Sequence, residues 1–174
     1  MNAVVVYESV YGNSRAVAEA IAEGLGASAL PVSEALAPAT EADLLVVGGP
    51  THMHGMTTER SRQMAIAAAH EDGGAAVDAH AGDGPGLRVW LRELPSVSKR
   101  KAACFDTRLD RSPWLTGVAA RGIGRRLRGR GYDVLATESF LVEDAEGPLE
   151  DGELDRARAW GAHLAELQPT ASGA

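Results

Sequence analysis

Short apolar runs and one spaced apolar stripe organise the first part of the chain. Residues 4–7 and 44–47 are continuous apolar runs, which are typical of strands buried on both faces of a parallel sheet. Between these runs, Val17, Ile21 and Leu25 recur every fourth residue and predict an amphipathic helix. The pattern therefore predicts a strand, a helix and a second strongly buried strand.

Glycines mark where these elements are expected to end. Gly24 and Gly26 are predicted to stop the first helix, because glycine accepts the left-handed backbone of a helix C-terminus. The second strong strand is expected to end at residues 48–50, which read Gly-Gly-Pro. Periodicity predicts further strands at residues 29–32, 102–105 and 132–142, the last interrupted near 137–138, and further helices at 58–70, 87–94, 119–127 and 154–164. The last helix is expected to bury Leu154, Ala157, Gly161 and Leu164.

Two segments carry no periodic pattern. Residues 71–86 are rich in Gly, Ala and Asp and are interpreted as an inserted surface loop, and residues 169–174 as a frayed tail. The remaining chain, residues 1–168, is predicted to form one domain, because 174 residues is close to the usual length of a single domain.

Five strands that alternate with helices predict the fold class. Each parallel connection needs a crossover, so the helices cover both faces of the sheet. We therefore expect a three-layer, doubly wound α/β domain with a five-stranded parallel sheet. In such sheets ligands bind beyond the carboxyl ends of the strands, where the strand order reverses. The loops after the first, third and fourth strands are the candidate site.

Composition and charge narrow the function. No segment approaches the ~20 continuous apolar residues of a membrane span, and the first residues lack a secretory-signal pattern, so we expect a soluble cytoplasmic protein. The net charge of -7 argues against nucleic acid and favours a partner with a positive face. Cys104 is the only cysteine, which excludes an intrachain disulfide and suggests core packing.

The first loop, residues 9–14, reads Ser-Val-Tyr-Gly-Asn-Ser between a strand and a helix. Gly12 lets successive amides converge, and Ser9 and Ser14 add hydroxyl donors where the helix dipole favours an anion. A phosphate ester fits this loop, and an ordinary helix start with Asn13 or Ser14 as N-cap fits it equally. The chain contains neither Gly-x-Gly-x-x-Gly after the first strand nor Gly-x-x-x-x-Gly-Lys, which disfavours dinucleotides and ATP. The spacing of His52 and His54 does not predict a metal site.

The order of these loops resembles the flavodoxin family. Residues 7–14 look like its phosphate loop, residues 48–55 like its second flavin loop, and residues 105–108 like its third, while residues 154–167 match its closing helix. The resemblance implies a flavodoxin-like fold that binds flavin mononucleotide (FMN) non-covalently. It assigns the phosphate to Ser9, Val10, Tyr11, Gly12, Asn13 and Ser14. It assigns the flavin ring to Pro50, Thr51, His52, Met53, His54, Gly55, Asp106, Thr107, Arg108 and Trp114.

Three positions depart from the family pattern. Tyr11 stands where Thr or Ser is common, His52 stands where many flavodoxins have Trp, and the third loop lacks its usual Tyr, which leaves Trp114 as the nearby aromatic residue. The function that the resemblance implies is electron transfer between redox partner proteins. The alternatives are an FMN-dependent NAD(P)H:quinone-type oxidoreductase and, third, a flavin-free adaptor. The acidic segment 143–155 is a candidate docking site for a basic reductase.

Overall fold

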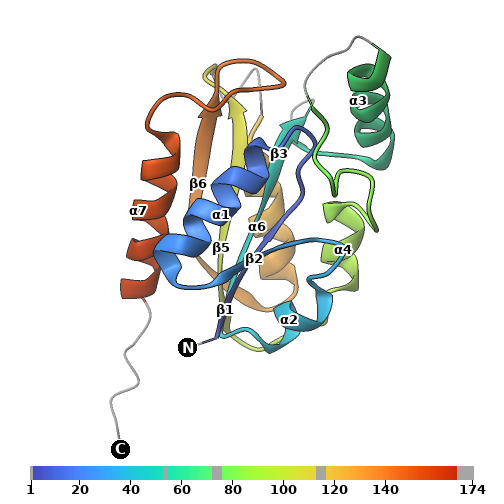
Figure 1. Cartoon of the computed structure of the whole chain (residues 1–174). Coiled ribbons are helices and arrows are strands. Elements are labelled where there is room, and N and C mark those ends of the chain that lie inside the picture. Colours follow the sequence, from blue (N-terminus) through green and yellow to red (C-terminus); the bar gives the residue numbers. More distant parts are fainter. Residues whose placement is uncertain (1, 53–54, 72–75, 113–116, 168–174) are drawn as a thin grey trace, which may run out of the picture.

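The computed structural model describes residues 2–52, 55–71, 76–112 and 117–167 (Figure 1). Its strands are β1 Ala3–Tyr7, β2 Ser28–Pro31, β3 Leu44–His52, β4 Gly55–Met56, β5 Arg100–Leu109 and β6 Tyr132–Val142. Its helices are α1 Asn13–Leu25, α2 Leu36–Glu41, α3 Glu59–Glu71, α4 Leu87–Glu93, α6 Ala119–Gly129 and α7 Glu153–Glu166. The predicted elements are all present, and α2 and β4 are additional to them.

Five strands form a parallel sheet in the order β2-β1-β3-β5-β6, and the short β4 pairs antiparallel with β3. The chain moves outward from β1 to β2 and then returns to the other side of β1 with β3. The strand order therefore reverses between β1 and β3, where Tyr7 lies beside Gly48. The predicted five-stranded, doubly wound α/β fold is confirmed.

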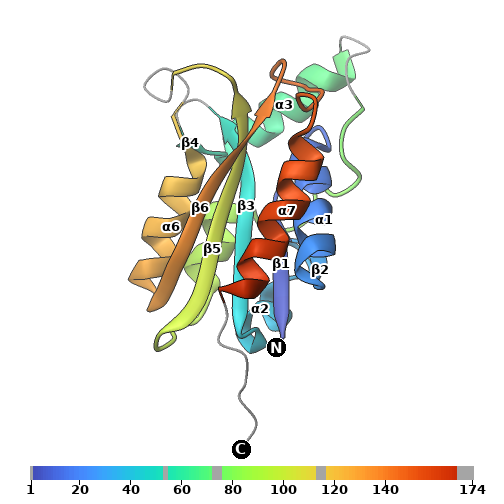
Figure 2. The ribbon, with the colours of Figure 1, turned by 90° about the vertical axis from the view of Figure 1, so that its left-hand side faces the viewer.

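Helices cover both faces of the sheet, as the side view in Figure 2 shows. On one face α1 and α7 pack on Val5, Val46 and Phe105. On the other face α2, α4 and α6 pack on the alternate strand residues, including Cys104, which is buried as expected. Among the helices of the described ranges, none has the length and apolar character that a membrane-spanning segment needs.

Gly24 and Gly26 have different roles in α1. Gly26 is the C-cap with φ 68°, so it ends the helix as predicted. Gly24 lies inside the helix, and a Cβ there would lie 2.0 Å from the carbonyl oxygen of Arg158 in α7. Gly161 of α7 makes the reciprocal approach, because its Cβ would lie 2.2 Å from the carbonyl oxygen of Ile21. The prediction that Gly24 stops the helix was wrong, since this glycine serves the close packing of α1 on α7.

Two strand boundaries also differ from the prediction. β3 continues past residues 48–50 to His52, because Pro50 still pairs with Thr107 of β5 and Thr51 pairs with β4. β6 is unbroken near Thr137, and its register shift against β5 lies instead opposite Ala102 and Ala103. The extent of both strands is therefore determined by hydrogen bonding to neighbouring strands, and the sequence pattern alone did not predict it.

The first turn of α7 was predicted with the wrong residue inside. Leu154 is 41% exposed, whereas the neighbouring Glu153 is 8% exposed. Glu153 is buried because its Oε2 accepts hydrogen bonds from the backbone N–H of Leu141, at 2.6 Å, and from Arg156 Nη2, at 2.7 Å. A carboxylate with these donors replaces the expected leucine at the start of the apolar face.

Candidate functional site

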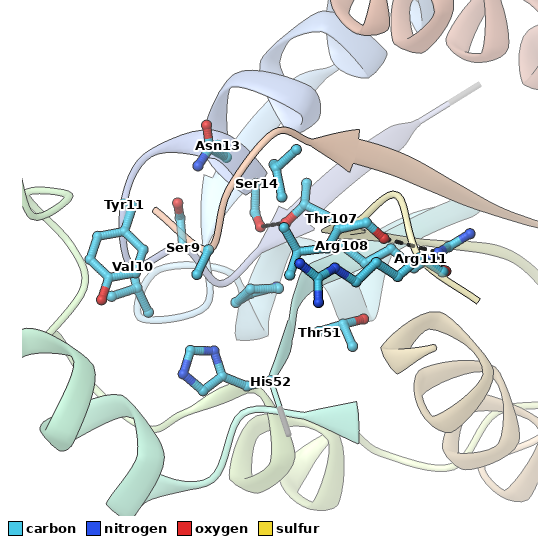
Figure 3. Close-up of a pocket in the computed structure, with 14 residues that line it drawn as sticks. Ser9, Val10, Tyr11, Asn13, Ser14, Thr51, His52, Thr107, Arg108 and Arg111 are labelled. Atoms are coloured by element: carbon cyan, nitrogen blue, oxygen red, sulfur yellow. Dashed lines mark hydrogen bonds between the residues drawn. The ribbon is translucent and has the colours of Figure 1, made fainter. Parts of the chain in front are cut away.

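A cavity of about 460 Å³ opens at the carboxyl ends of β1, β3 and β5, beside the reversal of strand order. This volume lies within the range of small-molecule sites. Figure 3 shows the residues that line it, which come from four separate segments. They are Ser9, Val10, Tyr11, Asn13, Ser14, Pro50, Thr51, His52, Thr107, Arg108, Leu109, Arg111, Val142 and Ala145.

Residues 9–14 form what we call the amide end of the cavity. Gly12 is the N-cap of α1 with φ 87°, and its N–H donates to Ser9 Oγ at 3.1 Å. The first bond inside the helix runs from the N–H of Ala16 to the carbonyl of Gly12, at 2.9 Å. No side chain caps this helix start in the described chain. The amides of the first turn, which have no intrahelical acceptor, are therefore suited to an anion.

Asn13 and Ser14 are the first residues of α1, and neither is its N-cap. Asn13 Nδ2 donates to the carbonyl of Glu146 at 3.1 Å. The hydroxyls of Ser14 and Thr107 lie 2.7 Å apart, and both residues are buried. The interpretation of this loop as an ordinary side-chain-capped helix start was wrong, because both side chains bridge to other elements.

Tyr11 lines the cavity with its ring and directs its phenol elsewhere. The hydroxyl donates to the carbonyl of Ala65 in α3 at 3.3 Å. Burial and the carboxylate of Glu146 raise the pKa of Tyr11, so the phenol stays neutral at neutral pH. The phenol of Tyr11 is therefore bonded to α3. It does not replace the phosphate-binding hydroxyl of the Thr or Ser that is common at this position in flavodoxins.

Residues 76–86 of the predicted surface loop pack behind the amide end. The N–H of Asp78 donates to the carbonyl of Val10 at 2.8 Å, and Asp78 and Ala81 are buried. Arg62 of α3 reaches the same segment by donating to the carbonyl of Gly84 at 3.2 Å. The loop that begins the site is thus supported from outside by a segment that lies almost seventy residues later in the chain.

The opposite end of the cavity is formed by Arg108, Leu109, Arg111, Val142 and Ala145, and we call it the arginine end. Figure 3 shows Arg108 and Arg111 well separated from Tyr11 and Val10. Arg108 Nη1 donates to the carbonyls of Leu109, at 3.1 Å, and Arg111, at 2.9 Å. No ion pair of either arginine is seen in the described ranges, so this end carries positive charge.

His52 and Pro50 form the wall between the two ends. Burial lowers the pKa of His52 below 6.5, so its imidazole is neutral at neutral pH. A neutral imidazole offers one donor and one acceptor to a ligand rather than a charge. Pro50, Val10, Leu109 and Val142 supply the apolar surface that a planar ring would need.

Asp106 was predicted to contact the flavin, but the structure places its carboxylate behind the wall. It has no exposed surface, and its Oδ2 accepts from Thr51 Oγ1 and from the N–H of Ala120, each at 2.9 Å. Thr51 Oγ1 also accepts from the N–H of Ala119 at 3.0 Å. Burial raises the pKa of Asp106. Asp106 and Thr51 therefore cap α6 from a distance, and only Thr51 also lines the cavity.

Other predicted residues are distributed unevenly. Neither Gly12 nor Gly55 is among the residues that line the cavity, and Gly55 pairs with His52 in the β3–β4 hairpin. Met53, His54 and Trp114 lie outside the described residues. Within the described ranges, no group of three or more His, Cys, Asp or Glu residues is placed to hold a metal ion.

Sequence reasoning missed Leu109, Arg111, Val142 and Ala145. Val142 and Ala145 follow from topology, because β6 lies beside β5 and the two strands end at the same edge of the sheet. Leu109 and Arg111 lie at and just after the end of β5, next to the predicted residues 106–108. The residues after β6 were treated only as an acidic segment. The expected position of the last strand beside the fourth would have indicated that Val142 and Ala145 belong to the site.

No protein-family model matches the chain, and no curated protein is similar in sequence. Solved structures are similar in fold. A flavodoxin from the domain Archaea has a TM-score of 0.60 and 19% identity over 95% of this chain and 97% of its own. A flavodoxin, WrbA-like protein from Agrobacterium tumefaciens has a TM-score of 0.60 and 20% identity, over 95% and 96%. Flavodoxin 1 from Bacillus cereus has a TM-score of 0.62 and 15% identity, over 97% and 99%.

These likenesses agree with the sheet order, the two helical layers and the position of the cavity. At such low identity they concern architecture and not activity. They extend over nearly the whole chain, so no large segment lies outside the common architecture. The predicted resemblance is confirmed at the level of the fold, and the chain has a flavodoxin-like fold.

Proposed function

We propose that this protein binds FMN non-covalently in the cavity and carries electrons between redox partner proteins in the cytoplasm. The observation that carries the proposal is the amide end itself. A helix start with a left-handed glycine N-cap and no side-chain cap opens into a cavity with apolar walls. A phosphate on an elongated, largely apolar ligand matches both features.

The residues present fit this ligand. The backbone of residues 12–14 and the hydroxyl of Ser9 would hold the phosphate, while Pro50, His52 and Thr107 would contact the ring. Bound flavin supplies one- and two-electron redox chemistry. The chain's own part is to bind and orient: neutral His52 offers a hydrogen bond, and Arg108 and Arg111 line the cavity with positive charge that would favour a reduced, anionic ring.

The partner's docking site would lie beside this cavity. Ala145 lines the cavity from within the acidic segment 143–155, and Glu143 and Asp144 are exposed. Glu153 does not belong to this docking surface, because it is buried and bonded to Arg156. A basic reductase face would meet the remaining carboxylates close to the flavin, and its docking would weaken with salt.

The test is retention of flavin by the purified protein. FMN is added, free flavin is removed, and the visible spectrum is recorded; riboflavin, which lacks the phosphate, is the matched control ligand. We expect FMN to be retained near one equivalent and riboflavin to be bound much more weakly. Equal affinity for the two flavins would contradict the role of the amide end. No retained flavin would contradict the proposal and leave the flavin-free adaptor.

The positive charge of the arginine end is also compatible with a second candidate, an FMN-dependent NAD(P)H:quinone-type oxidoreductase. Arg108 and Arg111 lie away from the amide end, where they could hold an anionic second substrate. The discriminating measurement is steady oxidation of NAD(P)H by the FMN-loaded protein with a quinone and no other protein. A carrier would show no turnover, whereas an oxidoreductase would show it.

A further inference from the structure

The outer sides of α4 and α6 gather arginines, and two of these, Arg121 and Arg128, line a second cavity together with Glu138 and Glu153. We call this set the α4–α6 basic surface. It consists of Arg88, Arg92, Arg121, Arg125, Arg126, Arg128 and Arg130. Glu93 is the only acidic residue in the two helices. Both helices turn their apolar sides, including Trp90 and Ile123, into one core on the same face of the sheet.

Part of this set is close together, around Arg126, and Arg88 of this part also donates to the backbone carbonyls of Met56 and Thr57. The pKa of Arg126 is lowered by burial and then by the charges of Arg88, Arg125 and Arg92. Arg130 donates to the backbone carbonyl of Arg92, which joins the end of α6 to α4. Arg126 Nη1 donates to the carbonyl of Gly122 at 3.2 Å. The acceptors are backbone carbonyls, which do not neutralise the charges.

Only some of the other arginines are ion-paired, since Arg60, Arg100, Arg108 and Arg111 also show no ion pair within the described ranges. Arg15, Arg62, Arg156 and Arg158 each form an ion pair with a carboxylate, at distances from 2.7 to 3.8 Å. No ion pair of the seven arginines is seen within the described ranges. Like charges held together without partners oppose folding, so a surface that keeps them needs a reason outside the monomer.

We propose that the α4–α6 basic surface docks an acidic face of another protein. Planar guanidinium groups suit carboxylates, which they bind in a bidentate way. None of the seven residues lines the flavin cavity, so the proposal goes beyond the proposed function. The partner at this surface is distinct in charge from the basic reductase that would dock at segment 143–155.

The observations disfavour other occupants. Outside the two helices and Arg130, the chain carries ten of the 17 Lys and Arg residues against 23 of the 24 acidic residues, which would repel an extended nucleic acid. The large exposed apolar side chains of the described residues, such as Met64 and Leu154, lie outside α4 and α6, so nothing there would insert into a membrane. A second copy would join unlike faces and propagate into an open chain.

The test uses a fluorescent glutamate peptide as the probe and measures its anisotropy with the full chain. R125Q/R126Q removes two charges from the surface and keeps good helix formers. R60Q/R158Q is the comparison variant, because it changes the net charge equally on α3 and α7, and the loss of the Arg158 ion pairs with Glu23 and Asp155 is checked by its thermal unfolding. We expect R125Q/R126Q to weaken peptide binding about five-fold, and the control to leave it within about two-fold. Backbone amide signals of α4 and α6 should shift on titration.

Four outcomes would overturn the proposal. They are equal weakening by both double variants, tighter binding of duplex DNA than of the peptide, tighter binding of phosphatidylserine vesicles, and self-association in the ultracentrifuge that R125Q/R126Q removes. The measurement is made with and without FMN. Failure to bind FMN would then contradict the proposed function while leaving peptide binding to be judged separately.

Discussion

The two ends of the cavity are built differently. The amide end is a contiguous stretch of six residues at one strand–helix junction, and its main feature is the left-handed Gly12. The arginine end combines the end of β5, with Arg108, Leu109 and the following Arg111, and the end of β6, with Val142 and the following Ala145. One end depends on local backbone geometry, and the other exists only because two parallel strands end side by side.

Under the proposed function, the amide end would determine the affinity for FMN, and the arginine end would adjust its redox potential. Backbone amides offer the same donors whatever the side chains are, so the amide end suits a constant group such as phosphate. Side chains at the arginine end set charge and shape, and their replacement would change potential or substrate more than affinity. Each of the following predictions acts on one end, on the support of the cavity wall or on the boundary between the two ends.

The largest effect is expected from Asp106→Ala, which removes the acceptor that supports Thr51 of the cavity wall and the start of α6. It leaves the N–H of Ala120 and the hydroxyl of Thr51 without their buried acceptor, so the free energy of unfolding should fall by about 3 kcal/mol. Urea unfolding measures this loss. A loss below about 1 kcal/mol would show that α6 does not depend on this cap.

Asp106→Asn tests the charge of the same residue without removing the acceptor. Because burial raises the pKa of Asp106 above 3.8, the folded state binds its proton more tightly than the unfolded state. Its contribution to stability is therefore greatest below pH 3.8 and is lost as the pH rises through the raised pKa. Relative to the wild type, the Asn variant should gain stability between pH 4 and pH 7. A constant difference over this range would contradict the prediction.

The next effect concerns the amide end, through Gly12→Ala with Gly26→Ala as its control. Both glycines cap α1 with positive φ, 87° and 68°, and a Cβ at either would meet no atom within 4 Å. Each change should therefore cost about 1–2 kcal/mol of stability. Only Gly12→Ala should also weaken FMN binding, by about ten-fold, as measured by flavin fluorescence. Similar affinities for the two variants would separate Gly12 from the ligand.

Ser14→Ala should have a smaller effect at the boundary between the ends. It removes the buried hydroxyl that lies 2.7 Å from Thr107 Oγ1, at a cost of about 1 kcal/mol in unfolding free energy. The Ser14→Ala/Thr107→Val double variant should cost less than the sum of the single variants. Thermal unfolding of the four proteins completes the cycle, and strict additivity would mean that the two hydroxyls do not interact.

The smallest effect is expected at the arginine end from Arg111→Gln. A unit charge ~10 Å from the flavin in an effective dielectric of about 40 is worth roughly 0.8 kcal/mol, or ~35 mV per electron. The midpoint potential of bound FMN should become more negative by about this amount, while FMN affinity stays within about two-fold. Redox titration measures the potential, and Arg60→Gln on α3 is the control. A large loss of FMN affinity with no change in midpoint potential would contradict the prediction, because it would show that the arginine end determines binding and not potential.

Much of the architecture was predictable because it depends on local pattern. The apolar runs of β1 and β3 and the apolar stripe on α1 can be recognised in the sequence without knowledge of the residues that pack against them. Gly12 and Gly26 have positive φ values, which glycine adopts readily. Together with short connections, these patterns determine a doubly wound sheet and the edge at which it binds ligands. The sequence by itself therefore determined the fold class and the amide end of the cavity.

Other features were decided only by the tertiary structure. Gly24 serves helix packing because Arg158 of α7 lies against it, and Glu153 is buried because Leu141 and Arg156 donate to it. Asp106, which the resemblance assigned to the flavin ring, accepts a hydrogen bond from the N–H of Ala120, because α6 begins behind it. In each case the role of a residue depends on a partner distant in the sequence, and a hydrogen bond or a packing contact has no periodic signature in the chain itself.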